Sequence, residues 1–303
     1  MTAPSPAGEP RRALLLVNRN AGNGGFDLAE IEAVLRAGGL AVETLAFPKK
    51  HAIPDAIRSR AGDADCVVVG GGDGTLHTAA AAVLESGLPL GVLPLGTAND
   101  LARTLGIGDD PLHAARVIAA GALRAIDLGE VNGHLFWNVA SIGVGPELAE
   151  RLPTPLKKHL GVLAYALAAI GSFHRLRPFA AELAFDGRRE RVRTVQVSVG
   201  NGRHHGGGMT VAADAEPDDG LLHVYSLEVR HWWGLLPLLP ALRRGDQGDR
   251  RGVRSFACRE LEVGTADPMP VIADGSETTT TPARFRIRRH AVRVYVPRRE
   301  NDA

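Results

Sequence analysis

A glycine-rich segment at residues 70–75 gives the clearest chemical signal in the sequence. It reads Gly-Gly-Gly-Asp-Gly-Thr and directly follows the apolar run 66–69, which is typical of a buried strand. Glycines between a strand and a helix allow positive φ and let backbone N–H groups approach an anion, and the helix dipole adds positive potential at the same point. The segment therefore predicts a loop that binds a nucleotide phosphate, with a tight structural turn as the alternative.

Asp73 stands in the middle of this loop. A carboxylate among amides that favour an anion argues against a purely structural turn. It predicts a side chain that holds Mg²⁺, directly or through water, or that accepts the proton of an attacking hydroxyl. The loop is not a P-loop, since it lacks the terminal Lys-Ser/Thr pair, and no Gly-x-Gly-x-x-Gly segment follows the first strand.

A second loop of the same kind follows the next apolar run. Residues 94–100 read Pro-Leu-Gly-Thr-Ala-Asn-Asp. Gly96 permits close approach of a ligand, and Asn99 and Asp100 can cap the following helix, which alone explains the segment. Because the carboxyl ends of parallel strands meet at the edge where such sheets bind ligands, the two loops together favour one nucleotide site.

Residues 11–125 alternate short apolar runs with helical patterns, and the apolar runs are continuous. This pattern is typical of a parallel sheet with helices on both faces. The predicted strands are 13–17, 41–45, 66–69 and 90–93, and the predicted helices are 27–37, 51–61, 76–84, 99–105 and 111–120. The sequence therefore predicts an α/β nucleotide-binding domain over 11–125, preceded by a disordered tail at 1–10.

The pattern changes near residue 125. Short, turn-bounded strands are predicted at 136–140, 180–184, 195–199, 221–225, 261–263, 285–287 and 292–296. Several alternate apolar and polar residues, which is typical of antiparallel sheets with one wet face. Helical segments at 157–173 and 231–243 interrupt them, and the threonine run 278–281 fits a turn. We therefore predict a β-sandwich domain over 126–303, and leave open whether its last strand returns to the first domain.

Composition excludes several other classes of function. The formal net charge of +1 provides no positive field for nucleic acid, and Cys66 and Cys258 are too few for a zinc cluster or a disulfide framework. No run reaches the roughly 18–20 apolar residues of a membrane helix, and no signal peptide precedes the first strand. We therefore expect a cytoplasmic protein without a transmembrane segment. Trp232 and Trp233 fit either a contact with a bilayer interface or packing of an amphipathic helix.

The two loops resemble those of a known enzyme family. Residues 71–75, taken with Gly-Thr-Ala-Asn-Asp-Leu-Ala-Arg at 96–103, are similar to the bacterial diacylglycerol kinase and sphingosine kinase-like family. Weaker matches lie at 17–22, 126–129, 200–201, 206–208, 218–221 and 274–275. The resemblance implies an α/β domain with a parallel sheet, of the NAD kinase/diacylglycerol kinase type, and a β-sandwich domain, with ATP in the cleft between them. It also implies Mg²⁺-dependent transfer of the γ-phosphoryl group to a lipid hydroxyl, foremost that of diacylglycerol.

The resemblance also implies roles for individual residues. Asp73, Asp100 and Asp127 match acidic residues that organise the nucleotide's metal and its waters, and Asp73 is also the candidate general base. Asp219 and the Leu221 carbonyl match a second, structural metal site. The residues that match the ATP site are Asn18, Gly71, Gly72, Gly74, Thr75, Gly96, Thr97 and Asn99.

The sequence departs from the family pattern at two places near the predicted site. The usual Asp-Gly-Glu becomes Asp-Gly-Ser-Glu at 274–277, so the candidate catalytic residue Glu277 comes one residue late. In an extended strand this shift places Glu277 on the opposite face, whereas a turn brings it back; an exposed turn carboxylate is the alternative. The usual Asn-Glu pair after the first loop is His77-Thr78.

Two other functions stay open at this point. An NAD kinase-like enzyme shares the loop 71–75 but not the segment 96–100, which favours a lipid acceptor. A catalytically silent nucleotide- or lipid-binding protein is supported only by the displaced Glu277. The predicted partner is a lipid substrate at a membrane surface, which would bring the protein to the inner face of the membrane. A homodimer is left open.

Overall fold

The computed structural model describes residues 11–19, 21, 26–143, 178–205, 209–210, 215–229, 238 and 250–298. The predicted tail 1–10, the predicted helix 157–173, the triple glycine 206–208 and, except for Leu238, the predicted helix 231–243 lie outside the described residues. Among the described helices, none is long and apolar enough to cross a membrane.

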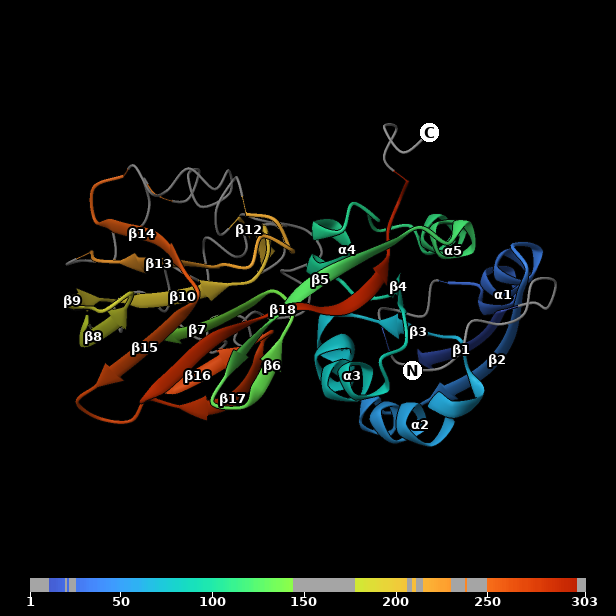
Figure 1. Ribbon diagram of the computed structural model, residues 1–303, viewed down its shortest axis with the longest axis horizontal. Helices are drawn as coiled ribbons and strands as arrows, with labels where there is room; N and C mark the ends of the chain where they lie inside the picture. The colour runs from blue at the N-terminus through green and yellow to red at the C-terminus, as the bar shows by residue number, and fades with distance from the viewer. Residues whose placement is uncertain are drawn as a thin grey trace, which may run out of the picture.

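Four apolar runs near the start of the chain form parallel strands, as predicted. They are β1 (Arg11–Asn18), β2 (Leu40–Phe47), β3 (Cys66–Gly71) and β4 (Leu90–Pro94), arranged in the order β2-β1-β3-β4. The helices between them are α1 (Leu28–Ala37), α2 (Ile53–Arg60), α3 (Asp73–Ser86), α4 (Asp100–Thr104) and α5 (Pro111–Ala120), with short turns η1 (Lys50–Ala52) and η2 (Ala61–Asp63) on either side of α2. Figure 1 shows α1 beside α5 and α2 beside α3, on opposite faces of the sheet. Every residue of β3 and β4 is buried because both faces are covered.

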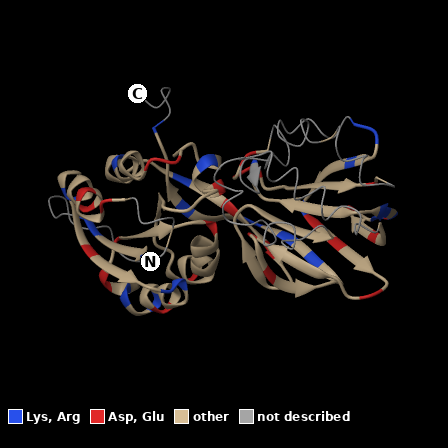
Figure 2. Cartoon of the chain, turned by 180° about the vertical axis from the view of Figure 1, so that it is seen from behind, with Lys and Arg blue, Asp and Glu red and all other residues tan. Residues whose placement is uncertain are grey.

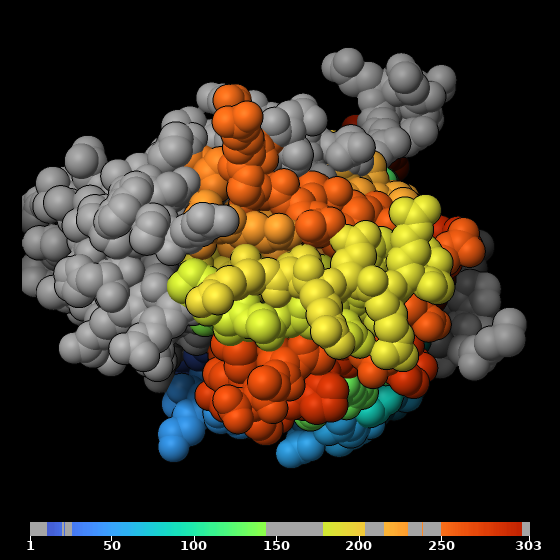
Figure 3. Space-filling model, turned by 90° about the vertical axis from the view of Figure 1, so that its left-hand side faces the viewer, coloured from blue at the N-terminus to red at the C-terminus, as the bar shows by residue number. Residues whose placement is uncertain are grey.

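The rest of the described chain forms a sandwich of two sheets, as predicted. Its strands are β5 (Leu123–Val131), β6 (His134–Phe136), β7 (Val139–Gly143), β8 (Phe179–Phe185), β9 (Arg188–Thr194), β10 (Gln196–Gly200), β13 (Leu222–Leu227), β14 (Val253–Cys258), β15 (Glu260–Thr265), β16 (Pro270–Ala273), β17 (Ser276–Thr280) and β18 (Ala283–Tyr295), and a separate short pair is β11 (His204–His205) with β12 (Met209–Thr210). One sheet, β14-β13-β10-β7-β16-β17, is antiparallel throughout, and it packs on the part of the other sheet that contains β18-β15-β8-β9. Figure 3 faces the far end of this sandwich and shows β8 and β9, in yellow, between the orange and red strands.

Strand β18 belongs to both domains and corrects the prediction of separate strands at 285–287 and 292–296. It pairs antiparallel with β5 along both of its halves, with a bulge between Arg288 and Val292. Near its end Val294 pairs in parallel with Leu90 of β4, while its first half pairs with β15. The sheet of the first domain is therefore mixed, and it continues into the sandwich instead of ending after four parallel strands.

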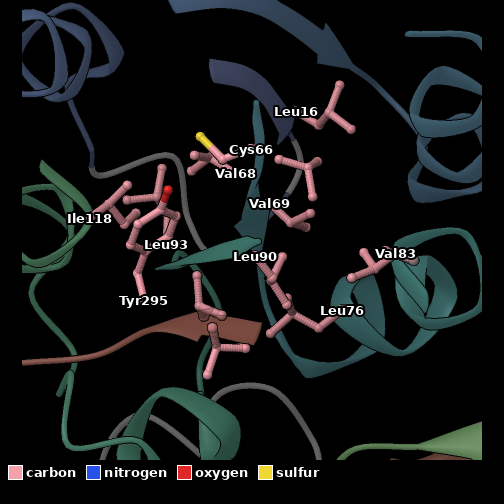
Figure 4. Close-up of a cluster of buried hydrophobic side chains, with 14 of the residues drawn as sticks. Leu16, Cys66, Val68, Val69, Leu76, Val83, Leu90, Leu93, Ile118 and Tyr295 are labelled. Atoms are coloured by element: carbon pink, nitrogen blue, oxygen red, sulfur yellow. The ribbon is translucent and has the colours of Figure 1, made fainter. Parts of the chain in front are cut away.

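The apolar side chains form two buried clusters that share this strand. The first cluster holds β1–β4, their helices and the end of β18. Figure 4 shows Tyr295 among these side chains, near Leu93 and Ile118. The second cluster fills the sandwich and includes Phe285 from the beginning of β18, together with Phe136. One strand thus anchors both cores.

A buried carboxylate stabilises the ladder between β5 and β18. Glu130 is 3% exposed and accepts hydrogen bonds from Arg286, at 2.7 Å, and from Arg288. Burial alone would raise the pKa of Glu130, but the hydrogen bonds from Arg288 and Arg286 outweigh it and lower the pKa below its ordinary value. Figure 2 shows that acidic and basic residues are otherwise spread over both domains, as the small net charge implies.

Two further segments of the sandwich differ from prediction. The predicted strand 136–140 is divided between β6 and β7. The two residues that separate these strands, Trp137 and Asn138, donate their backbone N–H groups to the Asp274 carboxylate. The threonine run 278–281, predicted as a turn, lies mainly in β17, which suits β-branched residues.

Replacing Gly129 by Ala is expected to lower the free energy of unfolding by about 2 kcal/mol, since overpacking a close-packed core costs about 1–3 kcal/mol. A Cβ at this position in β5 would lie 2.1 Å from Cζ of Phe136, which is fully buried. Urea denaturation measures the change. Gly264→Ala in β15 is the control, because nothing lies within 4 Å of a Cβ there. Equal midpoints for the two variants would contradict the packing described for Phe136.

Candidate active site

The two predicted loops touch each other at the carboxyl ends of β3 and β4. A Cβ on Gly72 would lie 3.0 Å from Cα of Gly96, and a Cβ on Gly96 would lie 2.4 Å from Cα of Gly72. The N–H of Leu95 also donates to the carbonyl of Gly71 at 3.1 Å. Only glycine allows this approach, which brings the N-termini of α3 and α4 together.

Internal hydrogen bonds fix the shape of the second loop. Asn99 adopts a left-handed conformation, with φ of 51°, immediately before α4. Its Oδ1 accepts the N–H of Gly96 at 2.9 Å, and its Nδ2 donates to the Gly96 carbonyl at 3.1 Å. The buried Asn99 side chain therefore holds the loop closed, and Thr97 at its tip is exposed.

Asn18, at the end of β1, and Thr75 fix the first loop in a similar way. Asn18 Nδ2 donates to Thr75 Oγ1 at 3.2 Å, and the Thr75 N–H donates to the Gly72 carbonyl at 2.8 Å. A Cβ on Gly71 would lie 2.5 Å from Cβ of Thr75, so this position also requires glycine. Three neighbouring strands thus contribute predicted ATP-site residues to one edge of the sheet.

Asp73 and Asp100 are the first residues of α3 and α4, and they face each other across the loop contact. Asp73 Oδ1 accepts the N–H of Leu101 at 3.3 Å. Burial, followed by the negative charges of Asp100 and Asp274, raises the pKa of Asp73 to about 6 despite this hydrogen bond. The site therefore concentrates negative charge beside two helix N-termini.

Asp274 brings a third carboxylate to this point from the second domain. Asp274 and Gly275, with φ of 45° and 80°, form the tight two-residue turn between β16 and β17. The Asp274 side chain is fully buried and accepts the N–H groups of Trp137, Asn138 and Val139 at 2.7, 3.0 and 3.3 Å. Its Oδ2 also lies 3.3 Å from Nδ1 of His77 on α3.

Further contacts hold the two domains together around these carboxylates. The indole N–H of Trp137 donates to the Leu76 carbonyl in α3 at 2.9 Å. On the other side a Cβ on Gly202 would lie 3.1 Å from Cγ2 of Thr104, so the chain after β10 packs on α4. The candidate site is therefore lined by both domains.

Glu277 lies in β17, the strand that follows the turn of Asp274 and Gly275. Glu277 is exposed and lies opposite Ile272, whereas Ser276 lies opposite Ala273, whose side chain is buried in the sandwich. Directly paired residues share a face of the sheet, so Ser276 and Glu277 point to opposite faces.

Asp127 is bound by the main chain of the second domain. Its carboxylate, 1% exposed, accepts the N–H of Gly220 at 2.7 Å and the N–H of His290 at 2.6 Å. Asn201 Nδ2 donates to the Asp127 carbonyl at 2.9 Å and to the Trp137 carbonyl at 3.0 Å. Asp127 and Asn201 thus fix the chain where it passes between the domains.

Asp219 and Leu221, predicted for a second metal, lie together in the loop before β13. Asp219 accepts the N–H of Leu221 at 2.8 Å and that of Glu216 at 3.1 Å, and its Oδ2 lies 2.8 Å from Nε2 of His223. Burial raises the pKa of Asp219, but the hydrogen bonds of His223, Glu216 and Leu221 outweigh it and leave the pKa below its ordinary value.

The residues around Asp73 fit a magnesium ion that is bound together with a nucleotide. Within the described ranges, no group of three or more His, Cys, Asp or Glu side chains could hold a metal ion alone. Mg²⁺ commonly binds one or two carboxylates together with phosphate oxygens and water. Burial is the first cause of the raised pKa of Asp73, and the negative charge of Asp100 is the second; a cation would relieve the repulsion between the two carboxylates.

Three residues of this site have no role that the sequence predicted. They are His77, Asp274 and Lys50, whose Nζ lies 3.1 Å from a Cβ built on Gly74. Lys50 follows β2, and the carboxyl end of that strand belongs to the same ligand-binding edge. The position of Lys50 after a predicted strand could therefore have indicated that it lies at this edge. For Asp274 the only signal in the sequence was the short motif at 274–275, and its place in the site depends on the packing of the second domain.

Known protein families match both halves of the chain. The model of the diacylglycerol kinase catalytic domain matches residues 12–131, and the model of the YegS C-terminal NAD kinase beta sandwich-like domain matches residues 139–296. A Pseudomonas aeruginosa protein named "Probable lipid kinase YegS-like" is 36% identical over 238 residues, 76% of each chain. A protein of the same name from Pseudomonas fluorescens is 36% identical over 234 residues, 76% of this chain and 77% of its own.

A solved structure supports the fold. A diacylglycerol kinase from Bacillus anthracis str. Sterne superimposes with a TM-score of 0.80, over 95% of this chain and 97% of its own, at 24% sequence identity. The α/β domain and the sandwich domain therefore occur together in a protein of similar length.

Replacing Asp73 by Asn is expected to stabilise the metal-free protein at neutral pH. Because the pKa of Asp73 is about 6, above its ordinary value of 3.8, the folded state binds the proton more tightly than the unfolded chain and loses stability as pH rises from about 4 to about 6. Above this pH range the ionised Asp73 lowers the free energy of unfolding of the wild type by at most about 3 kcal/mol. Below this range Asp73 is protonated and does not lower it. Urea unfolding in EDTA at pH 7.5 and pH 4 measures the difference. Asp63→Asn, at an exposed position, is the control. An equal effect of Asp73→Asn at both pH values would contradict the raised pKa of Asp73.

Replacing Asp274 by Ala is expected to destabilise the protein by about 3 kcal/mol, because it leaves several buried N–H groups without an acceptor. Alanine also tolerates the left-handed backbone at this position less well than aspartate. Thermal and urea denaturation measure the loss. Asp267→Ala, an exposed position in the preceding loop, serves as the control. A loss no larger than that of the control would show that the Asp274 hydrogen bonds contribute little.

Proposed function

The chain belongs to the diacylglycerol kinase-like family of lipid kinases, and from this premise we propose that it transfers the γ-phosphoryl group of ATP to a lipid hydroxyl, foremost that of diacylglycerol. The observation that carries the proposal is the contact between the two glycine loops beside Asp73 and Asp100. Backbone amides and two helix N-termini at one point suit a triphosphate. Carboxylates beside them suit the metal that accompanies it.

The glycine loops would bind the phosphates, and their neighbours would keep the loops in shape. Gly71, Gly72, Gly74 and Gly96 carry no side chain that would keep a phosphate away from the backbone, while the hydrogen bonds of Asn18, Thr75 and Asn99 prevent the loops from opening. Such a rigid arrangement requires little reorganisation when charge moves between phosphate oxygens. Phosphoryl transfer depends mostly on positioning of this kind.

The two acidic residues at the loop contact would divide the remaining tasks. Asp100 would hold Mg²⁺, which when bound neutralises charge on the phosphate oxygens. Asp73 would accept the proton of the lipid hydroxyl as the hydroxyl oxygen forms its bond to the γ-phosphorus and the bond from that phosphorus to the departing ADP breaks. A pKa of about 6 leaves Asp73 ionised at neutral pH yet more basic than an ordinary aspartate.

The second domain would complete the site without a direct role for Glu277. Asp274 binds the main chain of Trp137, whose indole contacts α3, and Asp127 keeps the neighbouring chain segments in register. Asp219 with the Leu221 carbonyl would bind a second, structural cation, as the resemblance to the family implies. The lipid would enter from a membrane surface, with the protein bound peripherally at its cytoplasmic face.

Transfer of label from ATP tests the proposal. The purified protein is incubated with γ-labelled ATP, Mg²⁺ and vesicles of mixed lipids, and NAD is supplied in a parallel reaction. We expect label in an organic-soluble product, and a loss of at least about 100-fold in Asp73→Asn, since a general base contributes about 10²–10⁴-fold. Label in NAD would favour the soluble-substrate kinase. Label in neither product, from protein that is folded, would overturn the proposal.

A further inference from the structure

Lys50 is a cation at the phosphate-binding edge that the sequence does not mark. It is the first residue of η1, after β2 turns away from the sheet. Its side chain is half-buried and reaches α3, where Nζ lies 3.1 Å from the position of a Cβ on Gly74. Gly74 is the second residue of α3, so the ammonium group lies on the first turn of that helix.

Two electrostatic effects oppose each other at this location, because Asp73, the first residue of α3, is negative at neutral pH whereas the helix N-terminus is positive. The N–H groups of a first helical turn carry partial positive charge, which repels a cation. Within the described part of the chain, no carboxylate pairs with the Lys50 ammonium, whereas the nearby Arg58 pairs with Glu85 and Arg60 pairs with Glu43. An anion bound at the N-terminus of α3 would contact the amides and the ammonium together.

The chemistry of the surroundings selects the kind of anion. The amides of loop 70–75 and an ammonium group are donors suited to phosphate oxygens. The glycine at position 74 leaves room for the ammonium group, because any Cβ there would crowd it. A polyphosphate that extends along the loop offers oxygens to both kinds of donor.

We propose that Lys50 binds a phosphate group of the nucleotide and thereby helps to position it. The proposal rests on the proposed function, since it takes ATP as the ligand of the glycine loops. Lys50 would add a movable positive charge to the rigid amides of the loop, and bound phosphate would remove the repulsion between the ammonium and α3.

Nucleotide binding without turnover provides the test. Dissociation constants for ATP, AMP and adenosine are measured by calorimetry for the wild type, Lys50→Gln and Lys50→Arg. We expect Lys50→Gln to weaken ATP binding about tenfold, the worth of one charge-assisted hydrogen bond at a half-buried site. Adenosine binding should change less than about twofold, because adenosine carries no phosphate, and Lys50→Arg should retain most of the affinity for ATP.

Lys49→Gln is the matched control, because Lys49 precedes Lys50 and is exposed. It removes the same charge from the chain and is expected to leave the affinity for ATP unchanged. If Lys50→Gln binds ATP as the wild type does, or loses ATP and adenosine equally, the role of Lys50 is overturned while the proposed function stands. If the folded wild type binds no ATP at all, the proposed function fails, and the inference fails with it.

Discussion

The close approach of Gly72 and Gly96 is the constraint on which the rest of the site depends. Strands β3 and β4 pair in parallel up to Gly71 and Pro94, so both chains leave the sheet at the same level. Their loops then meet backbone to backbone, which places the first turns of α3 and α4 side by side. The positive ends of two helices thus converge because of strand register. Any side chain at either glycine would separate them.

The same structure gives three aspartates different properties through the number of N–H groups that each accepts. Asp274 accepts three backbone N–H groups and Asp127 accepts two, so their buried carboxylates are bound by the fold itself. Asp73 accepts one from another residue, Leu101, and faces the charges of Asp100 and Asp274. Of these three aspartates, Asp73 accepts the fewest N–H groups from other residues, and its pKa is raised to about 6. Strongly perturbed carboxylates of this kind gather at functional sites.

The sequence predicted the parts of this arrangement that depend on short-range patterns. Continuous apolar runs identified the four parallel strands, and glycines after two of them identified both loops. Short-range patterns did not indicate the place of Asp274, because Asp274 and Asp73 are about 200 positions apart and meet only through the packing of a hairpin on the first domain. Only the resemblance of 274–277 to a family motif placed this segment near the site. The apolar pattern also divided β18 wrongly, because the arginine-rich bulge at 288–292 interrupts the apolar alternation, whereas the pairing with β5 resumes at Val292.

Strand β18 explains how a site built from both domains keeps a fixed geometry. Its beginning fills the sandwich core with Phe285, and its end fills the first core with Tyr295. Between them the ladder with β5 is continuous except for the bulge, where the N–H of His290 binds Asp127. A rotation of the domains large enough to move Asp274 away from Asp73 would strain this ladder and the Trp137–Leu76 hydrogen bond together. The carboxylates of Asp73, Asp100 and Asp274 are therefore held near one another by the sheet and the interdomain contacts, against their mutual repulsion.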